Sequence, residues 1–233
     1  MPITFMDIKM EIKIDKVIRT KRKTIALQIT DDATLIVRAP LEVSEQTIRN
    51  VVIKHKDWIE KKKENIIARD PKFVKKEFVN GEGFMHLGKY YKLSIVNKQS
   101  APLLFNNNCF SLLRDYLPVA REVFINWYKE RAYEKISERV EWYARKRGFV
   151  YNKINITDAN KRWGSCSIKG NLNFSWRLIM APLPIIDYVV VHELFHLEER
   201  NHTKFFWSKV KMLLPDYKKC KDWLEKNGYL LKL

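Results

Sequence analysis

The chain has 233 residues, of which 46% are apolar and 12% aromatic, with only seven Gly and eight Pro, so it is expected to fold into a globular protein. Its three cysteines are widely spaced and odd in number, which argues against a disulfide framework and against a Cys-based zinc finger. The 44 Lys and Arg against 27 Asp and Glu give a net charge of +17, which would attract nucleotides, nucleic acid or an anionic surface. A lysine-rich solvated surface without a partner is the alternative explanation.

No apolar run approaches the roughly 20 residues that a membrane span needs. The first residues, MPITFMDIKMEIK, alternate between polar and apolar side chains and lack the apolar centre of a signal peptide. We therefore expect no membrane association and a reducing, cytoplasmic location.

The first part of the chain is rich in predicted strands. Residues 8–39 alternate between apolar and polar side chains, with a turn at 30–32, which predicts a small antiparallel sheet. Ser44 is a good N-cap for a helix that continues to about Arg69 and is ended by Pro71. Turn residues at 88–89 and 106–108 then predict two further hairpins.

A long helix is predicted from Pro118 to Gly148. We place a domain boundary near residue 115, between a strand-rich region with one helix (1–115) and a helix-rich region (116–233). The expected fold class is α+β, with a small antiparallel sheet beside the helix that carries the motif described below.

Residues 151–157 are predicted to form a strand, and RWGSCSIKGNLNFSWRL at 162–178 a hairpin that turns at 169–171. In the return strand, Leu172 and Phe174 share an apolar face and Asn173 lies on the polar one. Pro184 then suits the first turn of a helix that continues into HELFHLEERNH at 192–202.

The spacing of His192 and His196 predicts a metal site. Residues four apart lie on one face of a helix, one turn apart, so both imidazoles can reach an ion about 2.0–2.1 Å away. Glu193 lies beside them and can take a proton from a metal-bound water, whose pKa zinc lowers to about 7. A buried helix with incidental histidines is the alternative, and it does not account for the intervening glutamate.

The sequence offers two candidates for the third ligand, His202 and Glu199. His202 can bind only if the helix ends, and Asn201 is a suitable place because Asn tolerates the left-handed conformation. The offsets match the metzincin pattern HExxHxxGxxH, but Glu199 occupies the position of its glycine. Glu199 is the rival third ligand, three residues after His196 on nearly the same face.

Seven segments of the chain together resemble the YgjP-like family of metal-dependent hydrolases. They are RTKRKTIALQIT (19–30), VRAP (37–40), RWGSCS (162–167), WRLIMAP (176–182), DYVVVHELFH (187–196), NHTKFFW (201–207) and PDYKK (215–219). The resemblance implies a zincin-like catalytic half, related in layout to the SprT-like proteases. It also implies that His192, His196 and His202 bind zinc and that Glu193 is the catalytic base. The family is labelled metallopeptidase, and a nucleotide-hydrolysing role is attached to it as well.

Three further residues are candidates for binding substrate. Segment 171–178 is expected to border the cleft, where it could pair with an extended peptide, and Asn173 lies within it. Arg162 and Arg177 could hold a phosphate or stabilise an oxyanion, and structural ion pairs are the alternative for both.

Three functions follow from these residues. The leading one is a zinc-dependent metallopeptidase, in which zinc-bound water activated by Glu193 attacks the scissile carbonyl. The second is hydrolysis of a nucleoside triphosphate phosphoanhydride by the same zinc and base, which the +17 charge favours. The third is a nucleic-acid-associated module with a structural metal. Three imidazoles suit zinc, and nickel, cobalt or copper would bind such a site too.

Overall fold

A computed structural model describes residues 12–30, 33–67 and 76–233 of the chain. The chain divides into two compact units, Met1–Phe73 and Val74–Leu233, which we call the N-terminal and C-terminal units. Across the described residues, no helix is both long and apolar enough to cross a membrane.

The N-terminal unit is a three-stranded sheet with two helices. The order of its strands is β1-β3-β2. Its elements are β1 (Lys16–Thr20), β2 (Ala26–Ile29), β3 (Leu35–Pro40), α1 (Glu45–Lys54) and α2 (Lys56–Ile67). β2 and β3 form the expected antiparallel hairpin, but β1 pairs with β3 in parallel, so the sheet is mixed rather than antiparallel.

The predicted single helix after Ser44 is two helices. Ser44 caps α1 as expected, since its side chain accepts a hydrogen bond from the backbone N–H of Thr47. The first helix ends at His55, whose φ of −107° and ψ of 20° are not helical. The helical path is interrupted at His55, and both α1 and α2 contribute to one core, which contains Ile48, Val52 and Ile59. Pro71, the expected terminator, lies outside the described residues.

The C-terminal unit contains two sheets and the longest helix. The first sheet has the order β4-β5-β7-β6, with β4 (Gly83–His86), β5 (Lys89–Val96), β6 (Leu103–Asn106) and β7 (Cys109–Leu113). Its two tight turns lie at the predicted places, and Gly88, Asn107 and Asn108 have the positive φ that such turns require. A 3-10 helix, Arg114–Val119, leads into α3 (Ala120–Arg147), which Gly148 ends in the left-handed conformation.

The division between the two units lies near residue 73 and not near residue 115. The sheet β4–β7 shares its core with α3, because Phe84 of β4 and Phe110 of β7 pack on Phe124 with ring centroids 4.2 and 5.3 Å apart. The side chain of Tyr128 also donates a hydrogen bond to the carbonyl of Met85. A boundary between the strand-rich and helix-rich parts would therefore cut through a single hydrophobic core.

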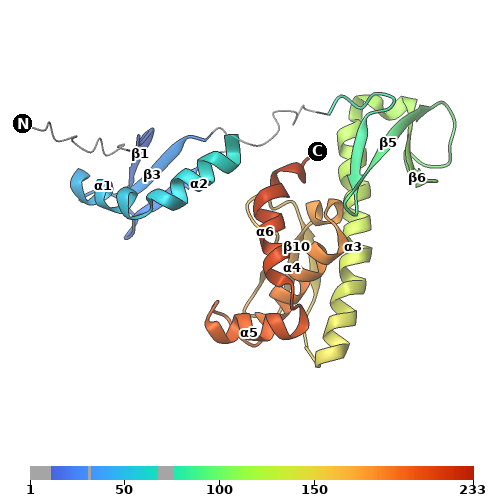
Figure 1. Ribbon diagram of the computed structural model, residues 1–233. Helices are drawn as coiled ribbons and strands as arrows, with labels where there is room; N and C mark the ends of the chain where they lie inside the picture. Colours follow the sequence, from blue (N-terminus) through green and yellow to red (C-terminus); the bar gives the residue numbers. More distant parts are fainter. Residues whose placement is uncertain (1–11, 31–32, 68–75) are drawn as a thin grey trace, which may run out of the picture. The chain divides into compact units, whose positions relative to one another are not determined.

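The remaining elements form the half that contains the motif. They are β8 (Ile154–Thr157), β9 (Gly164–Cys166), β10 (Leu172–Ser175), a 3-10 helix (Trp176–Met180), α4 (Leu183–Phe195), α5 (Lys204–Leu213), α6 (Tyr217–Asn227) and a final 3-10 turn (Gly228–Leu230). Figure 1 shows α3 running along the unit, with the β4–β7 sheet at its beginning and α4 and β10 beside its later turns. The α+β fold class is confirmed.

The second sheet differs from the expected one in two ways. Its order is β8-β10-β9, with β10 antiparallel to β9 but parallel to β8, so it is mixed. The return strand ends at Ser175, and Trp176 and Leu178 continue as a buried 3-10 helix. The alternation of apolar residues at 172, 174, 176 and 178 is typical of a strand, but it does not distinguish a strand from a short 3-10 helix, which can also bury apolar side chains.

Candidate metal centre and active site

Helix α4 positions the first two histidines. Its apolar residues bury most of its last two turns: Val190, Val191, Leu194 and Phe195 are each 0% exposed. Arg139 of α3 anchors the early part of the helix through two hydrogen bonds to Asp187, at 2.5 and 3.0 Å. Because the helix is held on several sides, the directions of His192 and His196 are fixed before any ligand binds.

The helix ends earlier than the sequence suggests. Its last residue is Phe195, and His196 is the C-cap, so the chain turns away about one turn before Asn201. The backbone N–H groups of Glu198 and Glu199 both donate to the carbonyl of Phe195, at 3.1 and 2.8 Å. The early end makes a left-handed residue unnecessary, and Asn201 is not among the residues with positive φ.

The three histidines of the motif converge on one point. Their Nε2 atoms are 3.2 Å (His192 to His196), 3.1 Å (His196 to His202) and 2.9 Å (His192 to His202) apart. Four-coordinate tetrahedral zinc with Zn–N bonds of about 2.05 Å requires nitrogens roughly 3.3 Å apart. The donor set therefore fits a tetrahedral ion with one further coordination position.

Glu199 contributes its backbone and not its carboxylate. The cluster of potential ligand atoms contains His192, His196 and His202. The carbonyl of Glu199 lies 2.9 Å from Nδ1 of His196. Because a carbonyl can only accept, Nδ1 carries the proton and Nε2 presents its lone pair to the cluster. The rival third ligand thus orients the second histidine.

Aromatic rings fix the other side of the cluster. Phe206 is fully buried and stacks on His196 with centroids 4.7 Å apart. Trp207 stacks on His202 at 5.6 Å and on Tyr217 of α6 at 5.3 Å. Thr203 caps α5 by accepting from the backbone N–H of Phe206, so the start of α5 places both rings.

The surroundings of His192 and His202 favour their neutral form. Burial lowers the pKa of His192 to about 3, with His196, His202 and Lys221 adding to the effect. The pKa of His202 is lowered as well, by burial and then by His196 and Lys221. Neutral imidazole is the form that binds a metal ion, so the environment favours the metal-binding state at neutral pH.

Glu193 is a buried carboxyl group beside this cluster. It is 5% exposed, and its Oε2 is buried with no hydrogen-bond partner among the described residues. Burial raises its pKa to about 8, and the charge of Arg162 acts in the opposite direction. A carboxyl group whose pKa lies near neutrality can both take up and release a proton at physiological pH.

Gly164 of β9 gives Glu193 its space. A Cβ at this position would lie 2.6 Å from both Cγ and Oε1 of Glu193, closer than atoms can approach. Glycine is therefore required where β9 passes the carboxyl group. The sequence contained a signal for this contact, a glycine within a predicted strand, but the contact itself joins residues 29 positions apart.

Arg200 attaches the segment after α4 to the β9–β10 hairpin. Its guanidinium donates to the carbonyl of Ser167 at 2.9 Å and to that of Ile168 at 3.3 Å. This link stabilises the turn that carries His202 back to the cluster. Nothing in the sequence around Arg200 distinguished it from other surface arginines.

The three candidate substrate residues have different surroundings. Arg162 is exposed and close enough to Glu193 to affect its pKa. Arg177 donates to Asp158 at 2.8 Å and lies over the ring of Trp176 at 4.4 Å, the structural pairing that was the alternative. Asn173 is bonded to Asn155 and Ser165.

Asn173 also lies on the wrong face of its sheet to reach Glu193. It pairs with Ser165, whereas Gly164, which contacts Glu193, pairs with Phe174. Because neighbouring residues of a strand point to opposite faces, the Ser165–Asn173 pair is directed away from the carboxyl group. β10 also lies between β8 and β9, so it has no free edge for a substrate.

Comparison with protein families decides the affiliation of the chain. The family model described as YgjP-like, metallopeptidase domain, matches residues 23–227. The chain belongs to the YgjP-like family. The YgjP-like domain spans nearly the whole sequence, so this protein is a metal-dependent, peptidase-like hydrolase whose three histidines are placed to bind the metal.

Two other comparisons add little to the YgjP-like assignment. A search of curated proteins gives no match. Among solved structures, the chain is similar to the crystal structure of the metallopeptidase zymogen of Pyrococcus abyssi abylysin. The sequence identity is 20%, the TM-score is 0.35, and the match covers 37% of this chain and 89% of that one.

Proposed function

We propose that the protein is a zinc-dependent metallopeptidase in which His192, His196 and His202 hold the metal and Glu193 is the catalytic base. The observation that carries the proposal is the convergence of three imidazole Nε2 atoms, 2.9–3.2 Å apart, beside a buried carboxyl group without a partner among the described residues. Zinc suits three neutral imidazoles, and bound zinc would supply Lewis-acid polarisation of water and of the scissile carbonyl.

Glu193 moves the proton in this proposal. Its unpartnered Oε2 would accept a proton from the attacking water and pass it to the nitrogen of the leaving amine. In the metal-free protein, burial raises the carboxyl pKa to about 8, and a bound zinc ion would act against this rise and favour the ionised form that a base requires. Arg162 opposes the rise, which keeps a larger fraction of Glu193 ionised at neutral pH.

The edge of β9 is our candidate position for the substrate backbone. β9 is an outer strand of its sheet and passes Glu193 at Gly164. A peptide that pairs with this edge in extended form would carry its backbone past the carboxyl group. Because strand pairing requires an extended chain, the expected substrates are short peptides and unfolded protein segments.

Hydrolysis of a phosphoanhydride is the second candidate function. It is favoured by two cations near the centre: the charge of Arg162 acts on Glu193, and that of Lys221 acts on His192 and His202. These charges would stabilise a nucleoside triphosphate. A purely structural metal, as in a nucleic-acid-associated module, leaves the unpartnered carboxyl of Glu193 unexplained.

A substrate panel distinguishes these functions. The purified protein is analysed for metal, and wild type and Glu193→Gln are then assayed on extended peptides and on nucleoside triphosphates. We expect about one zinc per chain, peptide cleavage, and a loss of about 10²- to 10⁴-fold in the Glu193→Gln variant. Cleavage of nucleotides alone would replace the first function by the second. Salt-dependent binding of nucleic acid without hydrolysis would support the third.

A further inference from the structure

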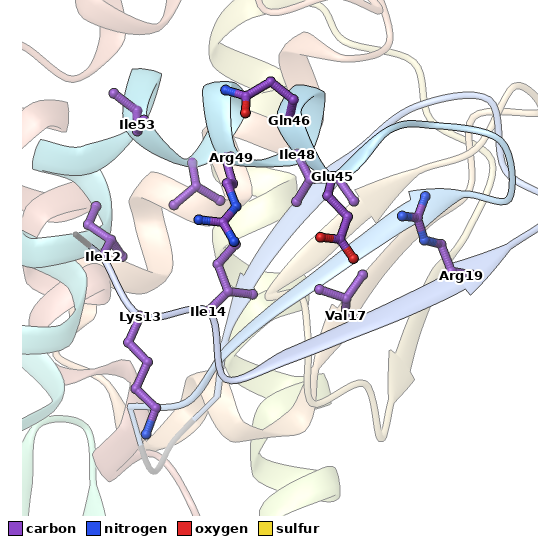
Figure 2. Close-up of a pocket in the computed structure, with 11 residues that line it drawn as sticks. Ile12, Lys13, Ile14, Val17, Arg19, Glu45, Gln46, Ile48, Arg49 and Ile53 are labelled. Carbon is purple, nitrogen blue, oxygen red and sulfur yellow. The ribbon is translucent and has the colours of Figure 1, made fainter.

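A trough in the N-terminal unit lies between strand β1 and helix α1. It has a volume of about 770 Å³, within the range of ligand sites. Figure 2 shows Ile14 and Val17 on the strand side and Ile48 and Ile53 on the helix side. All four of these apolar residues line the trough.

The trough exists because α1 covers β3 but leaves β1 partly bare. Val17 pairs with Val37 of β3, so both side chains lie on the helix-covered face of the sheet. Val37 is fully buried, whereas Val17 is 43% exposed, and Ile53 on the opposite wall is 63% exposed. The side chains of Val17 and Ile53 both line the trough, and Figure 2 shows them toward opposite ends of it, with Arg49 between them.

The same strand has a free edge. β1 is the outer strand of the order β1-β3-β2, so among the described residues its far edge pairs with no other strand. An outer strand presents a row of backbone N–H and C=O groups to any extended chain that lies beside it. An extended chain at this position could therefore hydrogen-bond to the backbone of β1 and place its apolar side chains in the trough.

Cationic groups surround the trough. Among the described residues that line it, Lys13 and Arg19 are cationic and Glu45 is acidic. Arg19 is held in place because its guanidinium donates to the carbonyls of Pro40 and Val43. The sequence continues beyond β1 with the basic residues at 21–23. Lysines on an edge discourage pairing with neutral or basic strands, but they favour an acidic one.

We propose that this trough binds an extended acidic segment of a partner protein, which adds a strand to β1 and inserts apolar side chains into the trough, against Val17 and Ile53. The unpaired backbone groups of β1 would supply affinity through hydrogen bonds. The apolar residues of the trough would select apolar side chains of the partner, and the cationic residues around it would favour acidic residues next to them. This site belongs to the N-terminal unit and does not depend on the metal centre or on the proposed peptidase activity.

The test measures the binding of a fluorescent peptide of about ten residues, with alternating Glu and Leu, to the full-length protein. We expect saturable binding that Ile53→Gln and Lys13→Gln each weaken on the order of 10-fold. Ile67→Gln and Lys61→Gln are matched controls, because both residues are exposed and lie on α2 outside the trough. The controls should bind as wild type does.

Three results would overturn the proposal. Equal binding by Ile53→Gln and Ile67→Gln would show that the trough is not the site. Equal binding of a peptide with N-methylated backbone amides would exclude strand addition, and equal binding of a peptide with Lys in place of Glu would exclude charge selection. Metal content, measured in parallel, should be the same in all four variants.

Discussion

The two units differ in how completely their candidate sites are built. In the C-terminal unit, neighbouring groups position three of the side chains at the metal centre: the Glu199 carbonyl orients His196, Trp207 stacks on His202, and Gly164 makes room for Glu193. In the N-terminal unit, the trough beside β1 keeps an open edge and half-exposed apolar walls. The difference fits two kinds of function, because catalysis requires preorganised groups whereas strand addition requires unpaired ones.

Removing one of the three histidines should have the largest effect, and that effect should be on the affinity for zinc. We expect His202→Ala to weaken zinc binding by more than about 100-fold, since loss of even an outer partner of a ligand costs about 10- to 100-fold. Competition with a chromophoric chelator measures the affinity. Glu199→Ala is the matched control and should keep its zinc, because its contribution is a backbone carbonyl. Zinc retained in the His202→Ala variant and lost in the Glu199→Ala variant would reverse our ligand assignment.

Adding a methyl group at Gly164 should displace Glu193, the proposed base. Gly164→Ala would put a Cβ 2.6 Å from Oε1 of Glu193, so the carboxyl group must move, and we expect kcat to fall by about 100-fold. The overpacking should also cost about 1–3 kcal/mol of stability. Gly83→Ala is the control, since its Cβ would meet Tyr90 at an ordinary 3.4 Å. Equal activity in the two variants would mean that Glu193 tolerates displacement.

The pH dependence of the metal-free protein should reveal the buried carboxyl group. Because the pKa of Glu193 is raised from 4.5 to about 8, its contribution to stability is complete below pH 4.5 and is lost as the pH rises through 8. The Glu193→Gln variant should not lose this stability at high pH, because glutamine does not ionise. In chelator-treated samples we therefore expect the variant to be more stable than wild type by a few kcal/mol at pH 9 and equally stable near pH 4. Parallel unfolding curves at both pH values would contradict a buried Glu193.

Acidification tests the histidines separately. The pKa of His192 is lowered from 6.5 to about 3, so its contribution is present above pH 6.5 and is lost as the pH falls toward 3. Wild-type metal-free protein should therefore lose stability below pH 6.5, and His192→Gln should lose less. Thermal unfolding between pH 7 and pH 4 measures the difference, and equal losses would place His192 in solvent.

The smallest expected effect compares the units directly. Removal of the metal should speed amide hydrogen exchange in residues 192–207 and leave exchange in residues 33–54 unchanged, because the N-terminal unit has its own core. Hydrogen exchange with and without chelator measures this. Faster exchange in α1 after chelation would mean that the two units are coupled.

Local features of the fold could be predicted from the sequence. Ser44 caps α1, Gly148 ends α3, and Asn107 and Asn108 form the β6–β7 turn, each through interactions within a few residues. The pairing of His192 with His196 followed in the same way from the pitch of a helix.

Long-range features could not be predicted in this way. The parallel pairing of β1 with β3 and of β8 with β10, the shared core of β4–β7 with α3, and the approach of Gly164 to Glu193 all join distant parts of the chain. The segment after α4 makes the same kind of contact, because Arg200 donates a hydrogen bond to Ser167 in the β9–β10 hairpin. The sequence therefore does not decide between His202 and Glu199 as the third ligand, because the course of the chain after α4 depends on distant residues.

The most direct test of the central claim compares two glutamates on either side of the second histidine. Peptide hydrolysis is measured for Glu193→Gln and Glu199→Gln at equal, verified zinc content. We predict that kcat falls by about 10²- to 10⁴-fold in the first variant and stays near wild type in the second. Full activity of the Glu193→Gln variant, with zinc bound, would contradict the assignment of Glu193 as the base.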